Sequence, residues 1–173
     1  NESPMPQAPI PLLIYGDGPR LRTGLARIAR DLTARLVAES DSLGIRVAQV
    51  GVDYPGGWHW QGWDFSGFQP NPQDQGQEAV AEALESLRVE TGQVPIVFMI
   101  MDPARCWELL RPRSAHDPEG PPMPPAVWWG YFPLDSHNSQ GAVGGPASAT
   151  ILTCDRRLAY TSFGAHVIQA TLR

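Results

Sequence analysis

The sequence predicts a single α/β domain, in which helices cover both faces of a doubly wound, Rossmann-like parallel sheet. Three observations lead to this fold class. Apolar runs of strand length alternate with segments of helical periodicity, most of these runs lack the polar alternation of a half-exposed strand, and glycine or proline separates many of the segments. The chain has 173 residues, of which 42% are hydrophobic and 18% charged, which is typical of a globular domain with a sizeable core.

The first predicted unit is a strand, a helix and a second strand. Residues 10–16 form a short apolar run that ends on glycine, as a buried strand does. Between residues 25 and 37, apolar side chains recur at helical spacing, and arginines occupy the opposite face. Gly44 is expected to end this helix, and residues 45–52 to form the second strand.

The alternation continues after a segment without a predicted element. Residues 54–75 hold three tryptophans and two phenylalanines among many glycines and prolines. Beyond them we expect a helix over 76–93 and a strand over 94–101. A second helix is expected to follow, with Asp102 as its N-cap and a proline at its first position. Further strands are predicted at 127–132, 149–154 and 157–160, and a final helix closes the chain.

Composition excludes several classes of function. The net charge is −5 and lysine is absent, so the composition provides no general electrostatic attraction to nucleic acid. No apolar run reaches membrane-spanning length and no signal peptide is recognisable, so we expect a cytoplasmic protein without a membrane span. Scattered histidines predict no metal site. Cys106 and Cys154 are expected to be buried, reduced thiols. Residues 1–9 are expected to be disordered or tag-derived, and residues 10–173 to form the domain.

Candidate site residues follow the strands, because ligands of such sheets bind where the strands end. The loop after the first strand, "GDGPRLRTG", contains Arg22, Thr23 and Gly24. Its glycines and the following helix N-terminus suit an anionic ligand. It lacks the Walker A and dinucleotide fingerprints, so a plain turn followed by a capped helix is an equal interpretation.

Two acidic positions have both a structural and a catalytic interpretation. Asp102 follows a buried strand, where it either caps a helix or orients a substrate hydroxyl as a base. Asp135 and His137 project to the same side if their segment is extended, so that the carboxylate would tune the imidazole. A solvated loop explains this pair equally well. Ser136 and Asn138 complete the polar cluster.

Tryptophans make the segment "GGWHWQGWDF" unusual. The flat apolar faces of Trp58 and Trp60 suit a sugar ring, a base or a partner protein. The structural alternative is a loop anchored to its own domain by tryptophan.

The order of these motifs resembles the N-terminal Rossmann-like domain of GT-B glycosyltransferases, especially family 4-like enzymes. The resemblance rests on "TGLARIARDLTARL" after a glycine-containing loop, on "GYFPLDS", and on the ending "CDRRLAYTSFGAHVI". It covers most of residues 10–173. The chain has one glycine in the loop where many members have two, and Asp102 where many members have histidine.

The resemblance implies the acceptor-binding half of an enzyme that transfers a sugar from a nucleotide-sugar donor, which is a substrate and not a cofactor. A second, C-terminal domain would hold most of the donor, so the 173 residues alone would be inactive. It also implies a substrate-binding role for Ser162. The resemblance also covers Gly24, Asp102, Asp135 and Ser136. Together with the residues selected from the strand ends, the predicted catalytic residues are Asp102, Asp135 and His137, and the predicted substrate-binding residues are Arg22, Thr23, Gly24, Trp58, Trp60, Ser136, Asn138 and Ser162. The alternatives are a stand-alone, non-catalytic binding module and a different nucleotide-using α/β enzyme.

Overall fold

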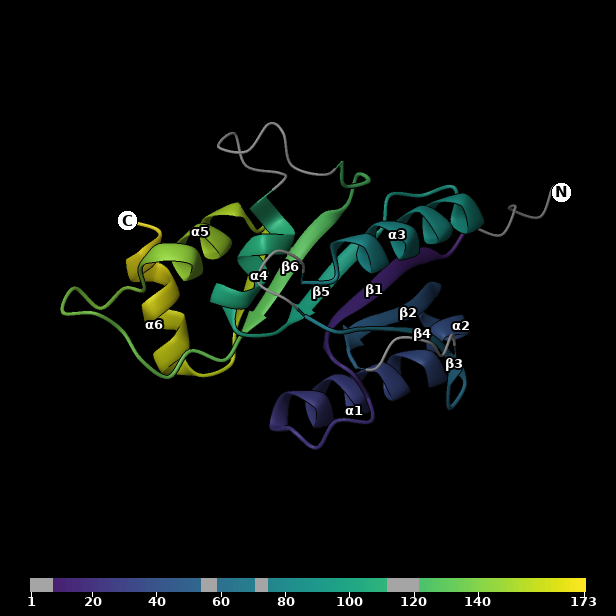
Figure 1. Ribbon diagram of the computed structural model, residues 1–173, viewed down its shortest axis with the longest axis horizontal. Coiled ribbons are helices and arrows are strands. Elements are labelled where there is room, and N and C mark those ends of the chain that lie inside the picture. The colour runs from purple at the N-terminus through teal and green to yellow at the C-terminus, as the bar shows by residue number, and fades with distance from the viewer. Residues whose placement is uncertain (1–7, 54–58, 71–74, 112–121) are drawn as a thin grey trace, which may run out of the picture.

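The domain is built on one sheet of six parallel strands with a short antiparallel strand at its edge. A computed structural model describes residues 8–53, 59–70, 75–111 and 122–173. Within these ranges the strands lie in the order β3-β4-β2-β1-β5-β6-β7 (Figure 1). Only β3 runs antiparallel, against β4. The strands are β1 (Ile10–Asp17), β2 (Ile45–Val52), β3 (His59–Trp60), β4 (Trp63–Phe68), β5 (Ile96–Ile100), β6 (Val127–Phe132) and β7 (Arg156–Ala159).

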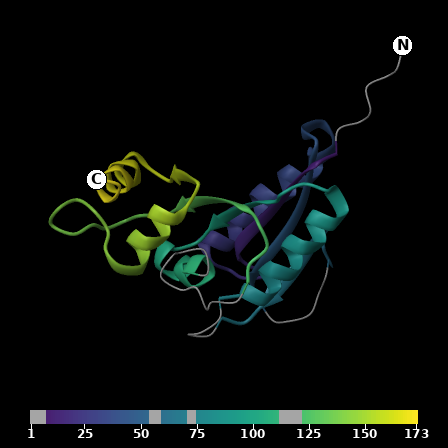
Figure 2. The ribbon, with the colours of Figure 1, turned by 90° about the horizontal axis from the view of Figure 1, so that it is seen from above.

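Helices pack on both faces of this sheet, which confirms the predicted doubly wound α/β fold. α1 contacts β1 and β2 on one face, whereas α3 to α6 contribute to the larger core on the other (Figures 1 and 2). Side chains of β1 alternate between the two cores: Leu13 and Tyr15 belong to the larger one and Ile14 to the smaller. The helices are α1 (Gly24–Ala38), α2 (Ser40–Leu43), α3 (Gln77–Thr91), α4 (Pro103–Leu110), α5 (Gly145–Thr153) and α6 (Ser162–Thr171).

The order of the parallel strands marks where a ligand is expected. The chain first moves outward from β1 through β2 to β4, and then returns to the other side of β1 as β5, β6 and β7. The direction therefore reverses between β1 and β5, and in open α/β sheets ligands bind outside the carboxyl ends of the strands at such a reversal. We call this side of the sheet the carboxyl edge.

One predicted strand is wrong, and two observed strands were not predicted. Residues 149–154 lie mostly in helix α5 and end at its C-cap, Cys154. The β-branched residues of this segment suggest a strand, but tertiary packing decides otherwise. Thr150 is buried and its hydroxyl donates to the carbonyl of Pro103 at 2.6 Å, while Ile151 is buried in the larger core. β3 and β4 arise from the tryptophan-rich segment, where no element was expected.

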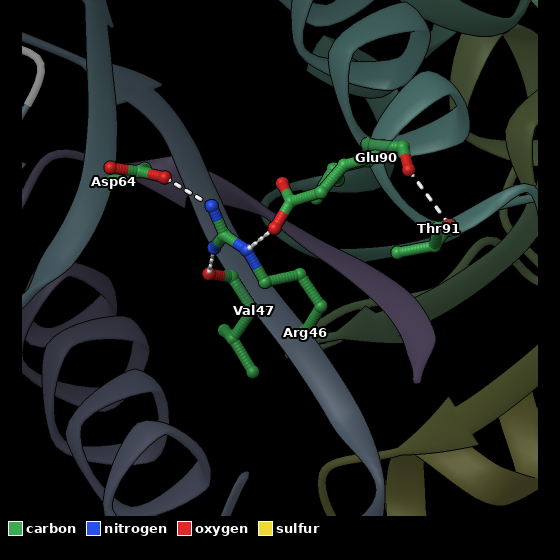
Figure 3. A network of polar contacts seen from close by, with 6 residues as sticks. Arg46, Val47, Asp64, Glu90 and Thr91 are labelled. Atoms are coloured by element: carbon green, nitrogen blue, oxygen red, sulfur yellow. Dashed lines mark hydrogen bonds and ion pairs between the residues drawn. The ribbon is translucent and has the colours of Figure 1, made fainter. Parts of the chain in front are cut away.

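At the opposite, amino end of the sheet, Arg46 joins β2, β4 and α3 (Figure 3). Its guanidinium donates to Glu90 Oε1 at 2.8 Å, to the Asp64 carboxylate, and to the carbonyl of Val47 at 2.7 Å. Burial acts to lower the pKa of Arg46, but hydrogen bonds and charge attraction from both acids outweigh it and raise the pKa above its usual value. The arginine thus ties two strands and a helix together.

Two further expectations concern the thiols and the membrane. Cys106 and Cys154 are both buried, as predicted. Burial, followed by the charges of Cys154 and Asp102, raises the pKa of the Cys106 thiol well above its usual value, so this thiol is a poor nucleophile. Among the helices of the described ranges, none combines the length and the apolar character that crossing a bilayer requires.

Candidate functional site

The loop that leaves β1 is held by a carboxylate and a helix cap. Asp17, the last residue of β1, is 5% exposed, and its carboxylate accepts a hydrogen bond from the hydroxyl of Thr23. The same hydroxyl oxygen accepts the backbone N–H of Ala26 at 3.0 Å, which makes Thr23 the N-cap of α1. The loop is therefore both a capped helix start and a fixed concave turn, and the two interpretations of its sequence do not exclude each other.

A second buried carboxylate lies beside this loop, at the end of β2. Asp53 is 5% exposed, and its Oδ2 atom accepts a hydrogen bond from Arg20 Nε at 3.0 Å. Gly18 fits between the two strand ends: a Cβ atom there would lie 2.7 Å from Asp53 Oδ2 and 2.7 Å from the carbonyl oxygen of Val52. Because a Cβ there would collide with both the Val52 carbonyl and the buried Asp53 side chain, glycine allows β1 and β2 to end so close together.

Arginines surround a hollow of about 530 Å³ next to this loop, which we call the arginine hollow. Arg20 and Arg22 come from the loop, and Arg27 and Arg30 from the first turns of α1. The helical pattern assigns the latter two to a plain polar face, so sequence reasoning missed their role. The available signal was their spacing. Arg27 and Arg30 lie one helical turn apart and follow closely on the two arginines of the loop. The full lining is Pro19, Arg20, Leu21, Arg22, Thr23, Arg27, Arg30 and Trp60.

Trp60 closes the arginine hollow from the β3–β4 hairpin. Its indole Nε1 atom is buried and has no hydrogen-bond partner within the described residues. The neighbouring Trp63 is different, because its indole N–H donates to Gln49 Oε1 at 3.0 Å in the core. Trp63 thus anchors the hairpin, whereas Trp60 is the tryptophan that borders the arginine hollow. Trp58 lies outside the described residues.

A second hollow of about 550 Å³, which we call the tyrosine hollow, shares Thr23 and Arg27 with the first. The two hollows therefore flank the first turn of α1. Tyr160 follows β7 and lies 5.2 Å from Tyr131 between ring centroids. Burial, with a smaller effect of Tyr160, raises the pKa of Tyr131, so the Tyr131 phenol stays protonated near neutral pH. The lining is Thr23, Gly24, Leu25, Arg27, Ile28, Pro133 and Tyr160.

Gly24 is the first residue of α1 and borders the tyrosine hollow. A Cβ atom added there would meet no atom within 4 Å. The packing of the protein therefore does not require glycine at this position. A side chain would instead extend into open space beside the helix N-terminus, where backbone N–H groups lack intrahelical partners.

Asp102 follows β5 and is the N-cap of α4, as predicted. Its Oδ1 atom accepts the N–H of Ala104 at 2.8 Å, and Pro103 occupies the first helical position. The residue is exposed and lies at the carboxyl edge, because β5 is parallel to β1. It lines neither of the two hollows.

The polar cluster after β6 is an exposed loop. His137 stacks on Phe163 with 5.5 Å between ring centroids, and its Nδ1 atom lies 2.6 Å from the carbonyl oxygen of Asn138. In the described part of the chain, no hydrogen bond or ion pair joins His137 to Asp135. Asn138 closes the loop itself, since its side-chain oxygen accepts the N–H groups of two later loop residues, Gln140 and Ala142. Asp135 and Ser136 are exposed.

Ser162 begins α6, after the end of β7, but Thr161 provides the cap: its Oγ1 atom accepts the N–H of Gly164 at 3.0 Å. The parallel strands thus bring Gly24, Asp102 and Ser162, together with the loop after β6, to the carboxyl edge, and of these predicted residues only Gly24 borders a hollow. Comparisons with models of protein families, with curated proteins and with solved structures found no match to this chain.

Proposed function

We propose that residues 10–173 are the acceptor-binding half of a GT-B-type glycosyltransferase, which transfers a sugar from a nucleotide-sugar donor. One observation carries the proposal: the N-terminus of α1, which follows β1 at the reversal of the sheet, lies between two hollows at the carboxyl edge. A ligand site is expected at this place in an open α/β sheet. The motif resemblance described above supplies the reaction.

The residues around α1 suit this role. The open position of Gly24 leaves room for a sugar hydroxyl or a phosphate to approach the helix N-terminus. Tyr160 offers an aromatic face, 44% exposed, beside that space. The cap formed by Thr23 and Asp17 keeps the turn in place, so the hollows exist before a ligand arrives.

The transfer step needs a group that takes the proton of the acceptor hydroxyl while that oxygen bonds to the anomeric carbon and the nucleoside diphosphate leaves. The proposal assigns this proton to one of the exposed carboxylates at the carboxyl edge, Asp102 or Asp135. A second Rossmann-like domain would stabilise the charge that develops on the leaving diphosphate. Without it, residues 1–173 are expected to bind acceptor but not to transfer sugar.

The test uses Gly24→Leu, which places a bulky side chain at the border of the tyrosine hollow where an added Cβ meets no atom within 4 Å, and Gly144→Leu as its matched control. Gly144 also stands at a helix start with no atom within 4 Å of an added Cβ, and it lines neither hollow. We expect saccharides from an acceptor panel to shift the amide signals of Thr23 and Gly24 in NMR spectra. Gly24→Leu should abolish these shifts and Gly144→Leu should preserve them. Shifts confined to other elements would contradict the proposed site.

The reaction itself is tested with the product of the whole gene and a panel of nucleotide sugars. Asp102→Asn is informative, because asparagine caps a helix as well as aspartate does but accepts no proton. We expect Asp102→Asn or Asp135→Asn to lower the transfer rate at least 100-fold with an unchanged melting temperature. Full activity of both variants would remove these carboxylates from the mechanism.

A stand-alone binding module is the second candidate, and one surface favours it. Leu158, Tyr160 and Phe163 lie close together in the chain on β7 and the start of α6, and are each about two-fifths exposed. Such an apolar surface suits a protein partner. A saccharide panel that leaves every amide signal unchanged, together with no transfer by the whole gene product, would favour this candidate.

A further inference from the structure

The charges around the arginine hollow are not balanced. Four arginines line it, and among the described residues no acidic one does. Asp53 pairs with Arg20 at 3.0 Å, and Asp31 lies 3.7 Å from both Arg27 and Arg30. With the buried Asp17 carboxylate, which accepts from the hydroxyl of Thr23, three acids lie near four arginines, so one positive charge is in excess, although the chain as a whole has a net charge of −5.

Arg22 is the cation with the fewest contacts. Within the described residues it makes no ion pair or side-chain hydrogen bond, and it is exposed at the mouth of the hollow. Arg30, by contrast, is fixed by a hydrogen bond from Nη1 to the carbonyl of Pro19 at 3.1 Å. The hollow therefore combines one preorganised guanidinium with one that can turn toward a ligand.

Trp60 points independently to a missing hydrogen-bond acceptor. Its buried indole N–H lacks a partner in the described ranges, and a buried donor without an acceptor costs about 1–3 kcal/mol. The first turn of α1 borders this hollow through Thr23, whereas Gly24 and Leu25 line the neighbouring tyrosine hollow. Four arginines and a tryptophan whose indole N–H has no partner in the described residues line the arginine hollow, and the group that matches such donors is an oxyanion.

We infer that the arginine hollow binds a phosphate-type oxyanion carried by a small-molecule ligand. A planar guanidinium donates two parallel hydrogen bonds to such a group, and the helix N-terminus favours its charge. A volume of about 530 Å³ accommodates a phosphorylated sugar or a molecule of similar size. That the carrier is the acceptor rests on the proposed function, whereas the oxyanion site does not.

The experiment titrates residues 1–173 with inorganic phosphate at constant ionic strength and follows the indole N–H signal of Trp60 by NMR. We expect saturable binding that shifts this signal. The double variant Arg22→Gln, Arg27→Gln should weaken phosphate binding at least tenfold. The control Arg35→Gln, Arg105→Gln removes the same charge from two exposed arginines outside the hollow and should change the affinity less than twofold.

A second variant, Trp60→Phe, removes the indole donor but keeps an aromatic ring. Its phosphate titration is followed through the backbone amide signals of Arg22 and Thr23, and we expect binding to weaken about fivefold. This variant gives an answer even if the double arginine variant does not fold. An unmoved Trp60 signal at millimolar phosphate would overturn the inference, as would equal losses in the control and the arginine variant.

Glucose 6-phosphate and glucose separate this inference from the proposed function. If the phosphate ester shifts the Trp60 signal while no saccharide shifts the Gly24 amide, the oxyanion site stands and the acceptor role falls. If saccharides shift the Gly24 amide but phosphate leaves Trp60 unmoved, the acceptor role stands and the oxyanion site falls.

Discussion

Two groups of arginines lie at opposite ends of the sheet and differ in how their charges are balanced. At the amino end, the single Arg46 is held by two acids, Asp64 and Glu90 (Figure 3). At the carboxyl edge, three of four arginines pair with two acids, whereas Arg22 has no ion pair within the described residues, and a tryptophan N–H beside them lacks an acceptor there.

This difference separates a structural role from a binding role for the same residue type. A paired arginine gains its stabilisation when the protein folds, and it has few donors left for a ligand. Arginines in excess repel one another in the folded protein and gain their stabilisation only when an anion arrives. The balance of nearby charges is therefore a better guide to a ligand site than the number of arginines.

The largest effect on stability is expected at Gly18, because this glycine allows β1 and β2 to end close together at the carboxyl edge. In Gly18→Ala, the new Cβ would meet Asp53 and the backbone of Val52 at 2.7 Å, so the loop after β1 has to shift. We expect a loss of about 3 kcal/mol of unfolding free energy in urea titrations, together with weaker phosphate binding. Gly24→Ala is the control and should change stability by less than about 0.5 kcal/mol. Equal stability of the two variants would show that the close approach at Gly18 is not required.

A smaller effect is expected from the two tryptophans of the hairpin. Trp63→Phe leaves the buried Gln49 oxygen without its indole donor, which should cost about 2 kcal/mol in thermal or urea unfolding. Trp60→Phe removes a donor that has no acceptor in the described residues, so stability should stay within about 0.5 kcal/mol or rise. A loss at Trp60 as large as that at Trp63 would mean that Trp60 is a structural anchor.

The smallest effect on stability is expected from single substitutions in the two arginine groups, at Arg46 and at Arg22. Arg46→Met should lower the unfolding free energy by about 1 kcal/mol, because both acid partners are about half exposed and become hydrated. This corresponds to about 2–4 °C in melting temperature for a chain of this size. Arg22→Met should leave the melting temperature unchanged without phosphate and reduce its rise when phosphate is added. If Arg22→Met lowered the melting temperature and Arg46→Met instead reduced the effect of phosphate, the structural and binding roles assigned to the two groups would be exchanged.

The buried elements of the fold were predictable because their physical cause is local. Strands β1 and β5 are covered on both faces and therefore read as continuous apolar runs. Strand β4 was missed because glycine and serine interrupt it, although Trp63 and Phe65 are buried in alternation with less buried residues. Helix α5 was read as a strand because its packing against α4, which a local pattern does not contain, overrides the propensity of its threonines and isoleucine.

The sequence predicts the candidate site only to the extent that it predicts where the strands end. The rule that ligands bind beyond the strands selects the loop with Arg22, Thr23 and Gly24. It does not reveal that Arg27 turns toward this loop, because a helical face that borders a hollow has the same sequence pattern as one that faces water. Nor could it separate Trp60 from Trp63, whose hydrogen bonding depends on Gln49 in a different strand.

The central position of β1 has a consequence for how the domain forms during synthesis. One edge of β1 pairs with β2, but the other pairs with β5, where Leu12 lies opposite Ile96. Contacts so distant in sequence form slowly, and β1 stays unpaired on that side until β5 has left the ribosome. All residues that line the arginine hollow lie between positions 19 and 60, whereas the tyrosine hollow also needs Pro133 and Tyr160. A nascent chain therefore contains every residue that lines the arginine hollow long before it contains those that complete the tyrosine hollow.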